Sequence, residues 1–87
     1  MRSVFKEQEK IREIDFGCVK LRLKELLKQK NYTRNQLSVN TGIKYQTIDR
    51  YYKGTGVERV DLTLLSKICY VLECSLSDLI EYIPPAK

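Results

Sequence analysis

Apolar residues recur along most of the chain at spacings of three and four, which is typical of amphipathic helices. A first helix is predicted near residues 19–30, on a stripe formed by Val19, Leu23, Leu26 and Leu27. The stretch Phe16–Leu23 also alternates apolar and polar residues, so the first part of this segment can be extended instead. No stretch gives a strong strand signal. We therefore expect an all-α domain.

Two short helices separated by a glycine are predicted next. Thr33 is a plausible N-cap for the first, and Gln36 completes a capping box with it. This helix is expected from Arg34 to about Asn40, burying Leu37 and Ser38. After Gly42, another helix is expected over about residues 44–52, with Ile48 and Tyr51 buried. Its opposite side displays Gln46, Asp49, Arg50 and Lys53.

Two further helices complete the predicted bundle. Asp61 caps the fourth, whose buried stripe consists of Leu64, Leu65, Ile68, Val71 and Leu72. Ser75 with Asp78 opens a last short helix, which carries Leu76, Leu79 and Ile80 and is ended by Pro84 and Pro85. The chain thus divides into an N-terminal extension (1–16), a helical domain (17–83) and a tail (84–87). The apolar residues of the extension have no clean period, so it is either a frayed tail or an added helix or strand.

Composition excludes several classes of function. With 87 residues the chain forms one domain, and with no histidine it has no His-based acid–base chemistry. The three cysteines have no ligand-like spacing and are an odd number, which argues against both a zinc site and a disulfide framework. No apolar run is long enough to span a membrane. We expect a cytoplasmic protein that is not an enzyme and that needs no metal and no cofactor.

The positive charge is concentrated in the middle of the chain. The net charge is +5, yet residues 17–60 contain ten of the 16 basic residues and only three of the 11 acidic ones. Such a concentration favours a polyanionic partner at one face. A solvated helix face is the plainer interpretation for residues 20–30 alone.

The segment Thr33–Gly54 has the order and spacing of a helix-turn-helix unit. Ser38 is small enough for the two helices to approach closely, and Gly42 stands where the chain turns sharply. The positions that must be buried are apolar: Leu37, Ile43, Ile48 and Tyr51. Over roughly residues 19–82 the chain resembles the Cro/CI-type (XRE-like, phage-repressor) helix-turn-helix family.

This resemblance implies a five-helix, lambda-repressor-like bundle that binds double-stranded DNA with its third helix in the major groove. It also implies a homodimer on a palindromic operator. The side chains that would face base edges are Lys44, Tyr45, Gln46 and Arg50. The positions that would contact phosphates are Thr33, Arg34, Thr47, Lys53 and Arg59.

Some residues depart from the family pattern. Asn31 and Glu73 stand where glycine is usual after a helix, and Leu27 and Tyr52 replace a frequent arginine and a common glutamate. Asp49 on the displayed face either accepts a hydrogen bond from cytosine or orients Arg50 or a neighbouring basic side chain.

The sequence therefore predicts a sequence-specific DNA-binding transcriptional regulator, and we expect a repressor. The alternative is an antitoxin-like interaction protein of the same fold, which binds a partner protein and regulates its own synthesis through DNA. An exposed apolar patch on the N-terminal extension would favour that alternative.

Overall fold

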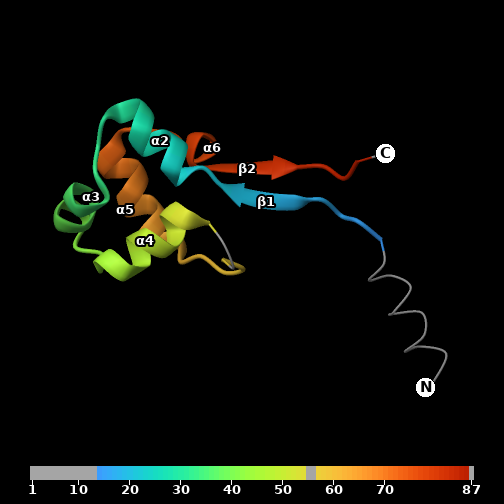
Figure 1. Cartoon of the computed structure of the whole chain (residues 1–87), viewed down its shortest axis with the longest axis horizontal. Coiled ribbons are helices and arrows are strands. Elements are labelled where there is room, and N and C mark those ends of the chain that lie inside the picture. Colours follow the sequence, from blue (N-terminus) through green and yellow to red (C-terminus); the bar gives the residue numbers. More distant parts are fainter. Residues whose placement is uncertain (1–13, 55–56, 87) are drawn as a thin grey trace, which may run out of the picture.

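The computed structural model describes residues 14–54 and 57–86. Helices α2 (Leu23–Lys30), α3 (Arg34–Thr41), α4 (Tyr45–Lys53), α5 (Leu62–Leu72) and α6 (Leu76–Leu79) form a bundle. Strands β1 (Cys18–Leu21) and β2 (Ile80–Ile83) pair antiparallel and extend from it as a two-stranded ribbon. Figure 1 shows α3 at the end of the bundle that lies away from the ribbon. The helical prediction is confirmed, with this small sheet as an addition.

Several helices begin or end at residues that the sequence singles out. Thr33 Oγ1 accepts from the Gln36 amide at 3.0 Å, and Gln36 Oε1 accepts from the Thr33 amide at 2.8 Å, so the capping box is confirmed. Asp61 caps α5 by accepting from the Thr63 amide at 2.8 Å. Asn31 and Glu73 end α2 and α5 in the left-handed conformation, with φ of 54° and 53°. Both residues therefore end their helices in the conformation that glycine usually adopts at this position.

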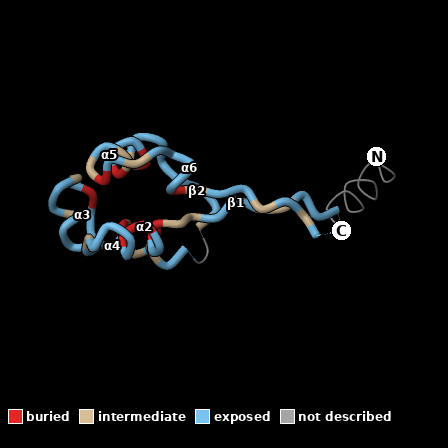
Figure 2. The backbone as a smooth tube through the Cα atoms, turned by 90° about the horizontal axis from the view of Figure 1, so that it is seen from above, coloured by how far each residue is buried: buried red, intermediate tan, exposed pale blue. Residues whose placement is uncertain are grey.

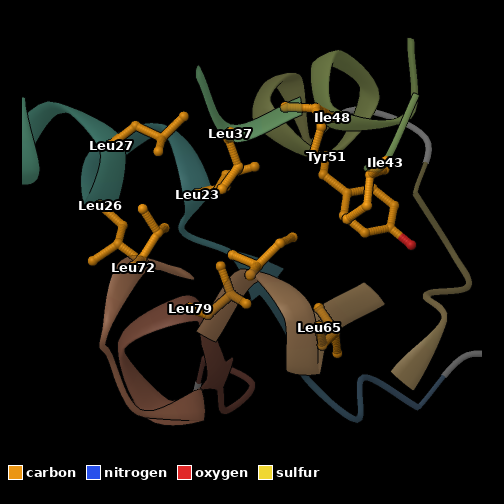
Figure 3. Packing of buried hydrophobic residues seen from close by; sticks show 11 residues of the cluster. Leu23, Leu26, Leu27, Leu37, Ile43, Ile48, Tyr51, Leu65, Leu72 and Leu79 are labelled. Atoms are coloured by element: carbon orange, nitrogen blue, oxygen red, sulfur yellow. The ribbon is translucent and has the colours of Figure 1, made fainter. Parts of the chain in front are cut away.

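The core lies between the helices, and every helix contributes to it (Figure 3). Leu23, Leu37, Ile48, Ile68 and Leu79 are fully buried. Ser38, expected to be buried, is only half-buried. Figure 2 shows that the buried positions lie in the bundle, whereas the ribbon is exposed or half-buried along its length. The core consists of Leu23, Leu26, Leu27, Leu37, Ile43, Ile48, Tyr51, Leu65, Ile68, Leu72 and Leu79.

Two helix boundaries predicted from the sequence are wrong. The first helix begins at Leu23 rather than near residue 19, and Val19 lies on β1 with 66% of its surface exposed. The last helix ends at Leu79, and the chain continues as β2 before it reaches the prolines. The apolar–polar alternation over Phe16–Leu23 is the signal that agrees with β1, because side chains along a strand alternate with a period of two, although only Leu21 of this strand is partly buried.

The ribbon has a fixed register, in which Val19 is opposite Tyr82 and Lys20 is opposite Glu81. Its far end is closed by the Tyr82 hydroxyl, which donates to the Phe16 carbonyl at 2.7 Å. Gly17 has a φ of +83°, and a Cβ there would lie 2.4 Å from the carbonyl oxygen of Ile83. Most of the N-terminal extension, residues 1–13, lies outside the described residues. The sheet therefore ties the start of the domain to its end.

Candidate nucleic-acid interface

Helices α3 and α4 are joined by a short turn that contains Gly42 and that is tied to α3 by a side-chain hydrogen bond. Gly42 ends α3 with a φ of 76°, and a Cβ there would meet nothing within 4 Å. Glycine is thus favoured by the left-handed backbone and not by crowding. The Ser38 hydroxyl donates to the Ile43 carbonyl at 2.6 Å, which links α3 to the residue after the turn. Ser38 therefore ties the turn together, a role beyond the small size that the sequence indicated.

The packing of α4 leaves one of its sides open to solvent. Ile48 and Tyr51 are buried in the core, at 0% and 2% exposure. The Tyr51 hydroxyl also accepts from the Asp61 amide at 3.2 Å, which anchors α4 to the start of α5. The four residues predicted to face base edges are all exposed: Lys44, Tyr45, Gln46 and Arg50. Lys44 is the N-cap of α4, and the other three lie within the helix.

The five residues predicted to contact phosphates have different surroundings. Thr33 is exposed, but its hydroxyl already caps α3. Thr47 is half-buried in the first turn of α4. Arg59 is exposed on the loop before α5, and no ion pair involves it within residues 14–54 and 57–86. Arg34 and Lys53, from two different helices, are brought together.

The residue that joins them is Asp49. Its Oδ1 accepts from Arg34 Nη1, and its Oδ2 lies 3.1 Å from Lys53 Nζ, one turn further along α4. The hydrogen bond with Lys53 is the largest effect and lowers the pKa of Asp49 below its ordinary value of 3.8. Burial opposes this shift, and the hydrogen bond with Arg34 adds to it. Of the two interpretations of Asp49, these contacts agree with the one in which it orients basic side chains. The side chains that it contacts are Arg34 and Lys53 rather than Arg50.

An aromatic contact holds Arg34 from a second side. Its guanidinium lies 4.3 Å from the centre of the Tyr52 ring and 5.9 Å from that of Tyr45. Leu27 is 2% exposed, and Tyr52 packs against the core beside it. The two residues that depart from the family pattern therefore each have a role here. Leu27 is part of the core, and the Tyr52 ring stacks on the Arg34 guanidinium. Sequence reasoning missed the stacking, since only the fold brings Arg34 and Tyr52 together.

A hollow of about 380 Å³ lies where α2 ends and α3 begins. Two basic residues, Lys28 and Arg34, contribute to its wall, and the first turn of α3 closes one side. The nearby cations and the positive end of the α3 dipole favour an anion. Its lining residues are Leu27, Lys28, Asn31, Tyr32, Thr33, Arg34 and Tyr52. The hollow extends the candidate phosphate surface beyond α3 to α2, which the sequence did not indicate.

No set of three or more potential ligands among His, Cys, Asp and Glu is grouped for a metal ion in the described part of the chain. The helices there are also too short or too polar to cross a bilayer. Burial, and after it the neighbouring Cys69, raise the pKa of the Cys74 thiol to about 11. Cys74 is accordingly protonated at neutral pH.

Comparison with known proteins agrees with this geometry. Residues 22–85 match the family model of the Cro/C1-type HTH DNA-binding domain. Among solved structures, a candidate DNA-binding protein from Bacteroides fragilis is similar with a TM-score of 0.65 and 25% identity, over 74% of this chain and 100% of that one. The transcriptional regulator VanUg is similar with a TM-score of 0.63 and 27% identity, over 84% and 95% of the two chains. No curated protein matches the sequence.

Proposed function

The chain belongs to the Cro/C1-type helix-turn-helix DNA-binding family, and from that premise we propose that it is a sequence-specific transcriptional repressor. That it is a DNA-binding regulator and not an enzyme follows from the family and from its solved relatives. The specificity for sequence, the repression and the contacts described below are the proposal. We expect it to act in the cytoplasm.

The exposed side of α4 is the observation that carries the proposal. In a helix-turn-helix domain the second helix of the unit enters the major groove and presents side chains to base edges. Here α4 is fixed through Ile48 and Tyr51, and its free side carries Gln46 and Arg50 one turn apart. Glutamine pairs bidentately with adenine and arginine with guanine, each pair discriminating by about 1–3 kcal/mol.

The remaining contacts divide between bases and backbone. Lys44 and Tyr45, at the start of α4, would reach base edges beside Gln46. The phosphate contacts would surround them on both sides and fix the register of the helix in the groove. In this proposal they come from Thr33, Arg34, Thr47, Lys53 and Arg59.

We assign the contact between two copies of the chain to the ribbon. Four large apolar side chains are more than half exposed there: Ile14 (54%), Phe16 (63%), Val19 (66%) and Tyr82 (59%). Within the described part of the chain each strand has one partner, which leaves its other edge without a neighbouring strand there. A two-stranded ribbon of this length is marginally stable alone, and exposed apolar patches mark interaction sites.

Charge favours a second copy as the occupant of this surface. Two copies of a chain with a net charge of +5 repel each other, and most strongly through their basic faces. The ribbon segments, residues 14–21 and 80–86, hold one lysine against the two carboxylates of Asp15 and Glu81. The ribbon therefore carries none of the excess positive charge that makes two copies repel each other, and such a homodimer would read a palindromic operator.

The antitoxin-like alternative shares one observation with this assignment. Ile14 and Phe16 belong to the N-terminal extension and are exposed. An unrelated protein partner would be favoured if the purified chain were monomeric and its ribbon were covered only in a complex with a second protein. The oligomeric state in solution separates the two functions.

Selection of binding sites from randomised duplex DNA tests the proposal. We expect the purified full chain to enrich an inverted repeat whose half-sites lie about one helical turn apart. Binding that enriches no motif and follows salt concentration alone would contradict sequence-specific recognition.

A further inference from the structure

The ion pairs on α4 contain a feature that base recognition alone does not require. DNA is a polyanion, so a carboxylate on the surface that meets it opposes binding. Asp49 lies in the middle of α4, between Gln46 and Lys53 in the sequence, with 24% of its side chain exposed. We therefore expect Asp49 to have a role that compensates for its repulsion of the DNA phosphates.

The contacts of Asp49 indicate what that role is. One carboxylate oxygen accepts from Arg34 on α3 and the other from Lys53 on α4. To accept a hydrogen bond from the amino group of cytosine, Asp49 would have to use an oxygen that already contacts Arg34 or Lys53. A role in reading cytosine is therefore disfavoured, and a role in holding the two basic side chains is favoured.

The same contacts fix Arg34 in space. Its guanidinium is held between the Asp49 carboxylate and the face of the Tyr52 ring, at 4.3 Å from the ring centre. An arginine bound in this way loses less conformational freedom when it contacts a phosphate. Lys53, by contrast, is 65% exposed, so its contact with Asp49 is open to exchange with solvent or with a phosphate.

We propose that Asp49 is a positioning residue that raises sequence discrimination by holding Arg34 in one arrangement and by cancelling one of the two positive charges of Arg34 and Lys53. The cancelled charge weakens binding to any duplex. The fixed position of Arg34 allows its phosphate contact only on a duplex whose bases fit α4. This inference rests on the proposed function, since it concerns the same DNA-binding surface.

The test compares Asp49→Asn with Glu73→Gln. Both substitutions remove one negative charge, but Glu73 lies at the end of α5, outside the proposed interface. For each protein the affinity is measured by fluorescence anisotropy, over a range of salt concentrations, for two duplexes. One contains the motif selected by the wild-type chain, and the other is a scrambled duplex of the same composition.

For Asp49→Asn we expect scrambled DNA to be bound several-fold more tightly. We also expect the slope of log affinity against log salt to steepen by about one, because one more cation is free to displace counterions. Affinity for the selected duplex should rise less, so that the ratio of the two affinities falls at least threefold. Glu73→Gln should leave that ratio unchanged, and Asp49→Glu should restore it in part.

Three results would overturn the inference. One is an Asp49→Asn protein with an unchanged affinity ratio and salt slope. Another is a change of preference at a single base pair with scrambled binding unaffected, which would make Asp49 a reader. The third is an equal loss on both duplexes, which would make it merely structural. A wild-type chain that selects no motif would instead contradict the proposed function.

Because loss of folding would mimic the third result, a second variant is included. Arg34→Lys keeps the charge but replaces the planar group that lies on Tyr52. We expect its affinity ratio to fall with little change in the salt slope. An unchanged ratio would contradict the claim that the position of Arg34, and not its charge alone, contributes to discrimination.

Discussion

The two ends of this molecule, with α3 at one and the ribbon at the other (Figure 1), expose different kinds of surface. Toward the first end, α3 and α4 present basic and amide side chains that stand on a buried apolar base, and Arg34 and Lys53 both contact Asp49. At the other end, the ribbon presents Phe16, Val19 and Tyr82 with few charges, and each of its strands has one edge that no other strand of the described residues pairs with. The first surface suits a polyanion, and the second suits another protein surface.

In our proposal, one small domain keeps its contact with DNA apart from its contact with a second copy of the chain. The core between the two surfaces is shared, since Leu23 of α2 and Leu79 of α6 are buried with Ile48 of α4. A substitution in that core would weaken both functions together. Substitutions of exposed residues at either end should affect one function and spare the other.

The largest effect is expected at the ribbon. In Val19→Lys, two added lysines would repel each other across a dimer contact, while the extra positive charge would not itself weaken DNA binding. We expect a monomer by sedimentation velocity. Affinity for the full inverted repeat should fall about 100-fold or more, because linked half-site binding contributes about 10²–10⁴. Affinity for an isolated half-site should stay within about threefold.

Leu62→Lys is the matched control for this prediction. Leu62 is 75% exposed on α5 and receives the same change of charge. It should remain dimeric. A monomeric Leu62→Lys protein beside a dimeric Val19→Lys protein would move the dimer contact from the ribbon to α5.

The next effect is expected at the other end, where Arg50→Ala should relax the preference at one base position in each half-site. The loss should be about 10–100-fold for the favoured base, which corresponds to about 1–3 kcal/mol. Competition binding with duplexes altered at single positions measures it. Since Arg50 is exposed, the dimer and the thermal midpoint should be unchanged. Uniform weakening over all duplexes would show that Arg50 contacts phosphate.

Lys53→Ala should have a smaller and less selective effect. As a phosphate contact, Lys53 contributes to every duplex, so affinity should fall a few-fold for selected and scrambled DNA alike. The salt slope should become shallower by about 0.9. A change in base preference without a change in slope would exchange the roles proposed for Lys53 and Arg50.

The smallest effect is expected for the pH dependence of stability, which depends on the ion pairs of Asp49 between α3 and α4. The pKa of Asp49 in the folded chain is below 3.8, chiefly through the hydrogen bond with Lys53. Its ion pairs therefore stabilise the fold fully above about pH 4 and are lost as the pH falls through the lowered pKa. Urea unfolding of the wild type and of Asp49→Asn should give midpoints that differ at pH 7 and converge as the pH falls through the lowered pKa of Asp49. A difference that persists in acid would mean that the carboxylate charge is not what stabilises this end.

Much of the bundle could be predicted because local signals agreed with the packing. The capping pair Thr33 and Gln36, the stop at Asn31 and the turn at Gly42 each act within a few residues. The buried positions of α4 and α5 follow a helical period. The side of α4 opposite its buried residues follows from that same period.

The ribbon and the Arg34 cluster could not be predicted in the same way, since both depend on contacts between distant parts of the chain. Val19 fits a helical stripe with Leu23 as well as it fits an extended strand, and only pairing with Tyr82 decides between them. The sequence predicts that the last helix carries Ile80 and is ended by Pro84 and Pro85, because nothing local marks Leu79 as its end. Likewise, only the packing of α3 on α4 places Arg34 against Asp49 and Tyr52.

The central claim is that α4 reads the base sequence, and a change of specificity at Gln46 tests it most directly. Repeating the selection from randomised duplex DNA with Gln46→Lys should replace adenine by guanine at one symmetric position in each half-site and leave the rest of the motif intact, because lysine donates to guanine where glutamine pairs with adenine. A motif identical to that of the wild type would contradict the claim, as would a motif lost at every position.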